Sequence, residues 1–229
     1  MKNKYPEYRQ HASVLLAAYN AKEKDYFAGA RRDYIDELPN NANACILEIG
    51  CGNGNTGAIA ISEGKCGRYC AVEIHGTAAE IARSKITEVV EGNVESVNLP
   101  WANQSFDALI LSEVLEHLVD PWEVLRKLRS LMKPGALVFA STPNVSNYKV
   151  VLMLLRGQWR LTDRGVMDRT HLRWFTPQTF REMFESCGYC VHQVRTVSPL
   201  SLKAKIASFI LGRRREYLFW GQIDLRASS

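Results

Sequence analysis

The residues best suited to hold a ligand are three glycines, Gly50, Gly52 and Gly54, in the stretch LEIGCGNG that covers residues 47–54. Glycine lets a backbone approach a ligand closely and adopts positive φ angles. A helix that begins just after such a turn offers free backbone N–H groups to an anionic group. Glu73 follows Gly50 by 23 residues, at the end of the next predicted strand, where a carboxylate can accept hydrogen bonds from ribose hydroxyls. The pattern predicts a nucleotide-type site, and a tight turn that binds nothing is the alternative.

The spacing of the glycines separates two classes of cofactor. Dinucleotide sites carry G-x-G-x-x-G, whereas this chain has G-x-G-x-G. The order strand, turn, helix, strand and terminal acid favours a bound cofactor over an empty turn. The spacing favours S-adenosylmethionine over a nicotinamide.

Alternating strands and helices must position these residues. Short apolar runs predict strands, and apolar residues in i, i+4 steps predict helices. This alternation is typical of a doubly wound, largely parallel sheet. The predicted strands are 45–49, 69–73, 105–111, 136–141, 189–197 and 216–225, and the predicted helices are 11–38, 56–63, 77–83 and 177–187.

A further helix has a clear start and stop. Asp120 can cap it, Pro121 fits its first position, and Glu123 would complete a capping box. Lys133-Pro134-Gly135 ends it. The apolar run 136–141 that follows is expected for a strand buried on both faces.

Composition excludes several classes of protein. The chain has 229 residues, of which 46% are hydrophobic, and a net charge of +5, which argues against collagen-like and disordered chains. No apolar run approaches the roughly 18–20 residues of a membrane helix, and residues 1–10 lack the pattern of a signal peptide. We expect a cytoplasmic protein, in which the six cysteines are thiols rather than disulfides. The pair Cys187 and Cys190 lacks the context of a redox or zinc site, so we predict no metal.

The motifs together resemble a known family. LEIGCGNG looks like the first motif of class I S-adenosylmethionine-dependent methyltransferases, and residues 92–145 resemble their later motifs. Residues 157–176, GQWRLTDRGVMDRTHLRWFT, are similar to a narrower subgroup, the type 11/type 23 methyltransferase domains associated with glycosyltransferases and surface-polysaccharide genes. The resemblance implies a Rossmann-like, seven-stranded sheet, mostly parallel, with an antiparallel last strand and helices on both faces. It also implies S-adenosyl-L-methionine as the cofactor.

The resemblance carries roles for individual residues. The glycine-rich turn would approach the methionine part, Glu73 would hold the ribose, and Ile74 would pack on the adenine. The family usually has Asp where this chain has Asn93, whose side-chain carbonyl can still accept a hydrogen bond. Arg31 would pair with the cofactor carboxylate, with Arg32 as the alternative. The implied cofactor-binding set is Arg31, Glu48, Gly50, Cys51, Gly52, Gly54, Glu73, Ile74, Asn93, Val94, Ser112, Glu113 and His117.

Methyl transfer to a hydroxyl needs a base, and histidine suits that role near neutral pH. His171, in the loop segment DRTH, and His117, which follows Glu113 in SEVLEHL, are the two candidates. For each, the alternative is a structural hydrogen bond. The predicted substrate-contacting residues are Trp159, Arg160, Asp168, Arg169 and His171, and a satellite core is the alternative for the tryptophan.

We predict one methyltransferase domain over 1–229. Its parts are a helical cap 1–40, a cofactor-binding core 41–142, a substrate-facing insertion 143–176 and a C-terminal helix with strands 177–229.

Two segments are basic. Residues 149–173 carry six Lys/Arg against two acids, and residues 200–229 have the same excess. We therefore expect a small-molecule or glycan acceptor that is anionic, and no nucleic acid. The segment 200–215 could contact a membrane surface or could be a solvated helix.

The predicted function is S-adenosylmethionine-dependent methylation of an oxygen atom in a sugar, glycan precursor or related small molecule, by in-line methyl transfer. Two other functions stay open. One is a cofactor-binding module without catalysis, and the other is an NAD-dependent oxidoreductase.

Overall fold

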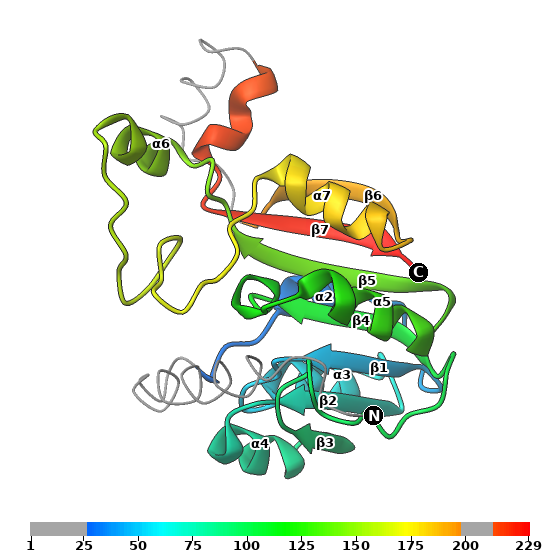
Figure 1. Cartoon of the computed structure of the whole chain (residues 1–229). Coiled ribbons are helices and arrows are strands. Elements are labelled where there is room, and N and C mark those ends of the chain that lie inside the picture. Colours follow the sequence, from blue (N-terminus) through cyan, green and yellow to red (C-terminus); the bar gives the residue numbers. More distant parts are fainter. Residues whose placement is uncertain (1–26, 198–212) are drawn as a thin grey trace.

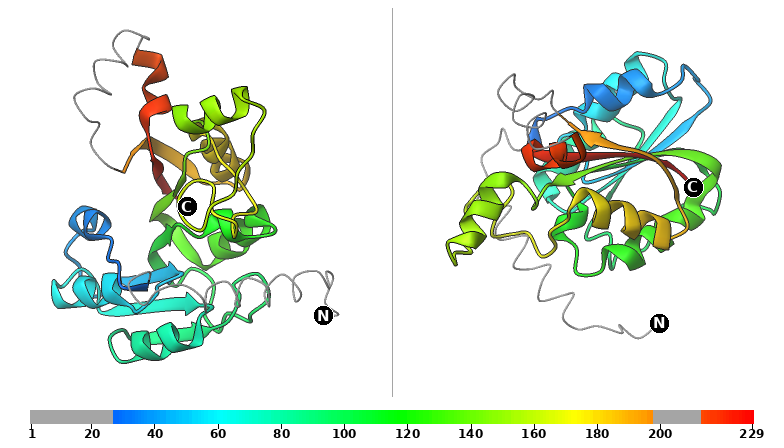
Figure 2. Two further views of the ribbon diagram at one scale, coloured as in Figure 1. Left: turned by 90° about the vertical axis from the view of Figure 1, so that its left-hand side faces the viewer. Right: turned by 90° about the horizontal axis from the view of Figure 1, so that it is seen from above.

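The computed structural model describes residues 27–197 and 213–229, which form a seven-stranded sheet with helices on both faces (Figures 1 and 2). The strand order is β3-β2-β1-β4-β5-β7-β6, and β7 runs antiparallel to both β5 and β6. The predicted fold class is confirmed, including the antiparallel last strand. The strands are β1 (Cys45–Ile49), β2 (Arg68–Glu73), β3 (Glu88–Glu91), β4 (Phe106–Ser112), β5 (Met132–Pro143), β6 (Cys190–Thr196) and β7 (Gln222–Ser228). The helices are α2 (Arg32–Glu37), α3 (Asn55–Ser62), η2 (Leu115–His117), α4 (Gly76–Arg83), α5 (Pro121–Leu131), α6 (Tyr148–Leu155), α7 (Pro177–Ser186) and η3 (Arg213–Phe219).

The central strands are apolar because both of their faces are covered. Every residue of β1 is buried, as expected for a parallel strand between two helical layers. Successive side chains point to opposite faces, so Leu109 packs with α5 and α7 while Ile110 packs with α2 and α3. This rigid sheet fixes the positions of the loops at its edge.

Helix α5 begins as predicted but with a simpler cap. The Asp120 side chain accepts a hydrogen bond from the backbone N–H of Glu123 at 2.9 Å, and Pro121 is the first helical residue. The return contact of a capping box is not formed, because the Glu123 carboxylate pairs instead with Arg126 at 3.4 Å. Strand β5 starts directly after the helix and is longer than the predicted 136–141, because it pairs with β4 on one side and β7 on the other.

Two further predicted boundaries were wrong, and one strand was missed. Of the predicted helix 11–38, residues 11–26 lie outside the described part, and only Arg32–Glu37 is α-helical in the rest. Residues 213–219 form a 3-10 helix, so the last strand is 222–228 rather than 216–225, in register with both β5 and β6. The short strand β3 was not predicted at all.

Two expectations from the sequence concern contact with a membrane and the state of the cysteines. Most of segment 200–215, for which a membrane contact and a solvated helix were the two alternatives, lies outside the described residues. Within 27–197 and 213–229, no helix combines the length and apolarity needed to cross a lipid bilayer. All six cysteines are free thiols, and Cys190 is exposed while the other five are buried.

Candidate active site

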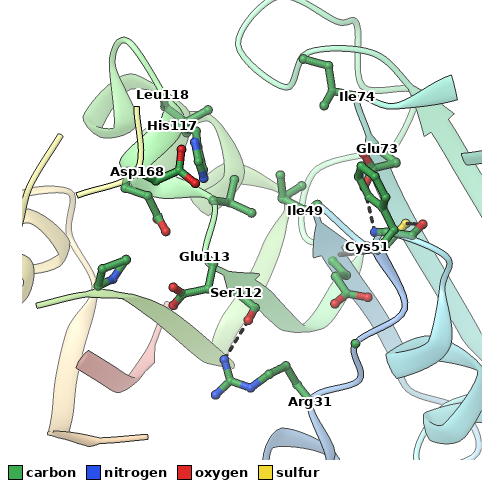
Figure 3. Close-up of a pocket in the computed structure, with 18 of the residues that line it drawn as sticks. Arg31, Ile49, Cys51, Glu73, Ile74, Ser112, Glu113, His117, Leu118 and Asp168 are labelled. Carbon is green, nitrogen blue, oxygen red and sulfur yellow. Dashed lines mark hydrogen bonds between the residues drawn. The ribbon is translucent and has the colours of Figure 1, made fainter. Parts of the chain in front are cut away.

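The carboxyl ends of β1, β2 and β4 open onto one cavity of about 730 Å³ (Figure 3). Ligands of open α/β sheets bind at this edge. The cavity is also lined by residues that precede α2, including Phe27 and Arg31, and by residues of the segment between α6 and α7, including Arg164, Asp168 and His171. Segments far apart in the sequence therefore meet around a single site.

The glycine-rich turn forms one wall of the cavity. Gly52 has φ +52°, and a Cβ atom there would lie 2.7 Å from the carbonyl oxygen of Phe27. The turn is held from the other side by β2, because Gly50 N–H donates to Val72 O at 2.8 Å. Gly54, predicted to bind the cofactor, does not line the cavity. It is the left-handed cap of α3, and a Cβ atom there would approach Ala82 at 3.0 Å, so it packs α3 against α4.

Glu73 lies at the end of β2, beside this turn, as predicted. Its carboxylate accepts hydrogen bonds from Gly52 N–H at 2.7 Å and from His75 N–H at 2.9 Å. Glu73 is only 4% exposed. Burial raises the pKa of its carboxyl group, although the hydrogen bonds from the two backbone donors act in the opposite direction. The two backbone donors fix the carboxylate at the cavity wall, and its oxygens can accept hydrogen bonds from ribose hydroxyls.

Asn93 and two apolar residues form the next part of the wall. Ile74, which follows β2, and Val94, which follows Asn93, line the cavity and have aliphatic side chains. The side-chain oxygen of Asn93 accepts from Glu95 N–H at 2.9 Å, whereas its buried amide nitrogen has no hydrogen-bond partner. An unpaired buried donor beside aliphatic groups fits a planar heteroaromatic ring that presents an acceptor nitrogen. The residues present therefore fit an adenine-containing cofactor.

Arg31 reaches across to the ends of β4 and β5. Its guanidinium donates to Ser112 Oγ at 2.8 Å and to Ser141 Oγ at 2.7 Å, and it pairs with Asp33 at 2.7 Å. It also lies over the Tyr34 ring, 3.6 Å from the centroid. Arg31 lines the cavity, whereas Arg32, the alternative, pairs with Glu63 and Asp36 away from it.

Glu113, which is half-buried, and Glu48, which is buried, place two carboxyl groups near Arg31. Glu113 has φ +54°, a region that non-glycine residues rarely adopt, and it turns the chain from β4 into η2. Burial raises the pKa of Glu113, and burial raises the pKa of Glu48 to about 7, although Tyr69 donates a hydrogen bond to Glu48 at 2.8 Å. Both residues lie on the cavity wall, as predicted.

The opposite wall of the cavity carries the Glu116 carboxylate and the imidazole rings of His117 and His171. His117 Nδ1 lies 3.1 Å from Thr170 O, and His171 Nδ1 lies 3.1 Å from Val166 O. The two rings meet edge to face with centroids 4.8 Å apart. Leu172 N–H donates to Glu116 O at 2.8 Å, so backbone bonds join η2 to the segment that carries His171. The structure thus brings the two predicted catalytic histidines together.

Three predicted substrate residues do not line this cavity. Trp159 is 46% exposed and packs edge to face on Trp174, with centroids 5.1 Å apart, which is the satellite packing named as the alternative. Arg160 is exposed, and Arg169 pairs with Asp163 at 3.3 Å. Asp168 and His171 do lie on the cavity wall.

Some lining residues were not predicted. Glu116, Val166 and Gln222 belong to this group. Glu116 comes three positions after Glu113 and one position before His117, and both of these are predicted site residues. This spacing is the one sequence signal that could identify Glu116. Gln222 comes from the last strand, and no local pattern ties it to the glycine-rich turn.

Comparisons with known proteins agree with this geometry. A methyltransferase domain family matches residues 20–194. The chain is 32% identical over 143 residues to a ubiquinone biosynthesis O-methyltransferase of Xanthomonas oryzae pv. oryzae, and the match covers 59% of each chain. A protein of the same name from Aeromonas salmonicida is 30% identical over 178 residues, with 70% of each chain covered.

Solved structures share the fold. A S-adenosylmethionine-dependent methyltransferase from Mesorhizobium loti superposes with a TM-score of 0.61 at 16% identity, over 89% of this chain and 100% of that one. Another from Archaeoglobus fulgidus gives 0.62 at 19% identity, over 90% and 97%.

These comparisons decide between the open alternatives. They favour S-adenosylmethionine over a nicotinamide and an enzyme over a binding module. They do not support the association with glycans that the sequence resemblance implied. Because the family match spans most of the chain and the fold agrees, the chain belongs to the methyltransferase domain family and is a class I S-adenosylmethionine-dependent methyltransferase.

Proposed function

We propose that this protein transfers a methyl group to an oxygen atom of a small-molecule acceptor. The observation that carries the proposal is the two-sided cavity. One wall has the glycine-rich turn, Glu73 and Asn93, which suit a nucleoside, and the other has Glu116, His117 and His171, which suit a hydroxyl group. Figure 3 shows Glu73 and His117 on opposite sides of the cavity. The names of the relatives, which are O-methyltransferases, support oxygen as the atom that is methylated.

The cofactor would lie along the first wall. Glu73 would accept hydrogen bonds from the ribose hydroxyls, because its carboxylate is already oriented by two backbone donors. Ile74 and Val94 would enclose the adenine, and the Asn93 amide nitrogen would donate to a ring nitrogen. Arg31, with Ser112, would face the methionine carboxylate. S-adenosylmethionine supplies a methyl group that is already activated on a sulfonium.

The chain's own task is then alignment, exclusion of water and removal of one proton. In a neutral imidazole, the contact of Nδ1 with a backbone carbonyl makes Nδ1 the donor and leaves the lone pair on Nε2. Both His117 and His171 have this contact, at 3.1 Å each. His171, on the acceptor side, is our choice for the residue that takes the hydroxyl proton, and His117 orients the wall beside it.

The acceptor's charge is part of the proposal. Arg164 lines the cavity, whereas Arg160 is exposed outside it. The segment 149–173 has an excess of four positive charges, six Lys/Arg against two acids. We therefore expect an anionic acceptor, and we assign the core 41–142 to the cofactor and the insertion 143–176 to the acceptor. A sugar or glycan precursor is one class of hydroxyl compound to screen, and the comparisons do not favour it.

Two measurements test this function. Calorimetric titration with S-adenosylhomocysteine should give saturable binding, and titration with NAD should give none. Incubation of hydroxyl compounds with methyl-labelled S-adenosylmethionine should then raise the mass of an acceptor by one methyl group at oxygen. His171→Ala should lower turnover more than cofactor affinity. Binding of NAD alone, or methylation at nitrogen or carbon only, would overturn the proposal.

A further inference from the structure

Glu116, His117 and His171 form a group that does more than line the cavity. All three are buried, with exposed fractions of 1%, 5% and 7%. One possible ligand atom from each residue lies within 4.8 Å of those from the other two. A carboxylate and two imidazoles this close, from η2 and from the segment before α7, match the donors of many protein metal sites.

The hydrogen-bonding capacity of the Glu116 carboxylate is only partly satisfied. One of its oxygens accepts from Thr142 Oγ1 at 3.3 Å, and the other oxygen is buried with no hydrogen-bond partner. Leaving a buried acceptor unpaired is costly, and a bound cation would supply the missing partner.

The two imidazoles are oriented as metal ligands are. A ligating histidine usually donates its other ring N–H to a carboxylate or a backbone carbonyl, which fixes the tautomer and the ring plane. His117 and His171 each place Nδ1 3.1 Å from a backbone carbonyl oxygen, of Thr170 and Val166 respectively. In the neutral rings the lone pair is then on Nε2, the atom that would bind a metal.

We propose that Glu116, His117 and His171 bind one divalent transition-metal ion on the acceptor side of the cavity. This departs from our prediction of no metal, which considered only the cysteines. Two nitrogens and one oxygen suit Zn²⁺, Co²⁺ or Fe²⁺, whereas Mg²⁺ prefers oxygen ligands. Metal–ligand bonds of about 2.1 Å require ligand atoms at most about 4.2 Å apart, and the three candidate atoms lie within 4.8 Å of one another.

The metal's role rests on the proposed function. Three protein ligands would leave coordination positions open, as in catalytic zinc sites, and all three residues line the cavity. An acceptor hydroxyl bound there would lose its proton at lower pH. In the metal-bound protein His171 would be a ligand and would not act as the base. The acceptor O–H proton would then pass to water, the O–CH₃ bond would form, and the CH₃–S bond would break with its electron pair returning to sulfur. Acceptors with two adjacent oxygens would bind the ion through both.

The test is metal binding itself, measured without any acceptor. Protein dialysed against a chelator is titrated with Zn²⁺ by calorimetry and with Co²⁺ by visible absorption, with Mg²⁺ as the comparison ion. We expect one Zn²⁺ per chain, weaker binding of Mg²⁺, and a Co²⁺ spectrum without thiolate charge-transfer bands. Glu116→Gln and His171→Ala should each weaken Zn²⁺ binding at least tenfold.

His192→Ala is the matched control. His192 also has an imidazole ring in a hydrogen bond, because its Nε2 lies 3.0 Å from Ser228 Oγ. Since the residue is exposed on β6, its replacement should leave Zn²⁺ affinity unchanged. Affinity for S-adenosylhomocysteine should stay within twofold in all three variants, which shows that each is folded.

The outcomes separate this proposal from the function. No Zn²⁺ binding by the original protein, unchanged binding in Glu116→Gln and His171→Ala, or thiolate bands with Co²⁺ would each overturn the metal site. None of these results would count against the proposed methyl transfer. Failure to bind S-adenosylhomocysteine would instead refute the proposed function.

Discussion

Replacement of Glu73 by Gln is the sharpest test of the cofactor side. Glutamine keeps the shape of the side chain but replaces one acceptor oxygen with an NH₂ donor. In the folded protein both oxygens of Glu73 accept from backbone N–H groups, Gly52 at 2.7 Å and His75 at 2.9 Å. One of these donors must therefore face another donor in the variant.

The expected magnitude follows from the number of charged hydrogen bonds that are lost. A hydrogen bond to a charged group contributes about 1.5–3 kcal/mol. If glutamine retains one acceptor for the ribose and loses the other, the dissociation constant for S-adenosylhomocysteine rises about 10- to 150-fold. The free energy of unfolding should change less than the binding free energy. The variant loses a buried hydrogen bond to the backbone, but it also no longer buries the charged carboxylate, whose burial is unfavourable, as the raised pKa of Glu73 indicates.

Isothermal titration with S-adenosylhomocysteine, together with Tm, measures both effects. Glu91→Gln is the matched control, because Glu91 pairs with Glu73 in the register of β2 and β3 but is a surface residue that contacts Arg83 at 3.1 Å. Its affinity should stay within twofold of the original. If Glu73→Gln also stayed within twofold while folded, or if the control lost as much affinity, the assignment of Glu73 to the ribose would be wrong.

Three further predictions concern the rest of the site. Gly52→Ala should lower both Tm and cofactor affinity, because its Cβ atom would lie 2.7 Å from Phe27 O at a φ of +52°; an affinity like the original's in calorimetry would contradict this. Burial raises the pKa of Glu48 to about 7 from 4.5, so between these values the folded state holds a proton that the unfolded state has released, and stability falls as pH rises. From pH 5 to 7.5, urea unfolding should show the original losing about 2 kcal/mol relative to Glu48→Gln, and parallel curves would refute the burial argument. Arg164→Glu should raise KM for an anionic acceptor at least tenfold in a salt-dependent way, whereas Arg160→Glu, outside the cavity, should not; equal effects would remove Arg164 from the acceptor site.

Local patterns predicted the parts of the fold in which local physics decides the structure. The strand before Gly50, the glycine-rich turn and the acid that ends β2 follow each other along the chain, and the predicted cofactor residues other than Gly54 line the cavity. Gly54 has the same sequence signal as its neighbours. It differs because its Cβ position faces Ala82 on α4, and sequence spacing does not record which side of a turn a helix covers.

The acceptor side was harder to predict because long-range contacts build it. His117 and His171 are 54 residues apart, yet their rings meet. The exposed Trp159 and the cavity-lining Arg164 lie in one continuous basic segment, and no periodicity distinguishes a residue that points inward from one that points outward in a loop. Strand β7 was misplaced for a related reason: its bounds are set by the two strands on which it must pair.

The insertion of β7 between β5 and β6 has a consequence for the order of events during synthesis. Arg31 is held partly by Asp224, at 3.5 Å, and Tyr34 of the same helix region donates to that carboxylate at 2.9 Å. Asp224 belongs to β7, some 190 residues later in the chain. A ribosome can therefore complete the glycine-rich turn and Glu73 early, but Arg31 gains its full set of partners only after β7 has emerged. Such distant pairings form slowly, so the capacity to retain cofactor should be acquired late, and a nascent chain stalled before β7 should bind it poorly.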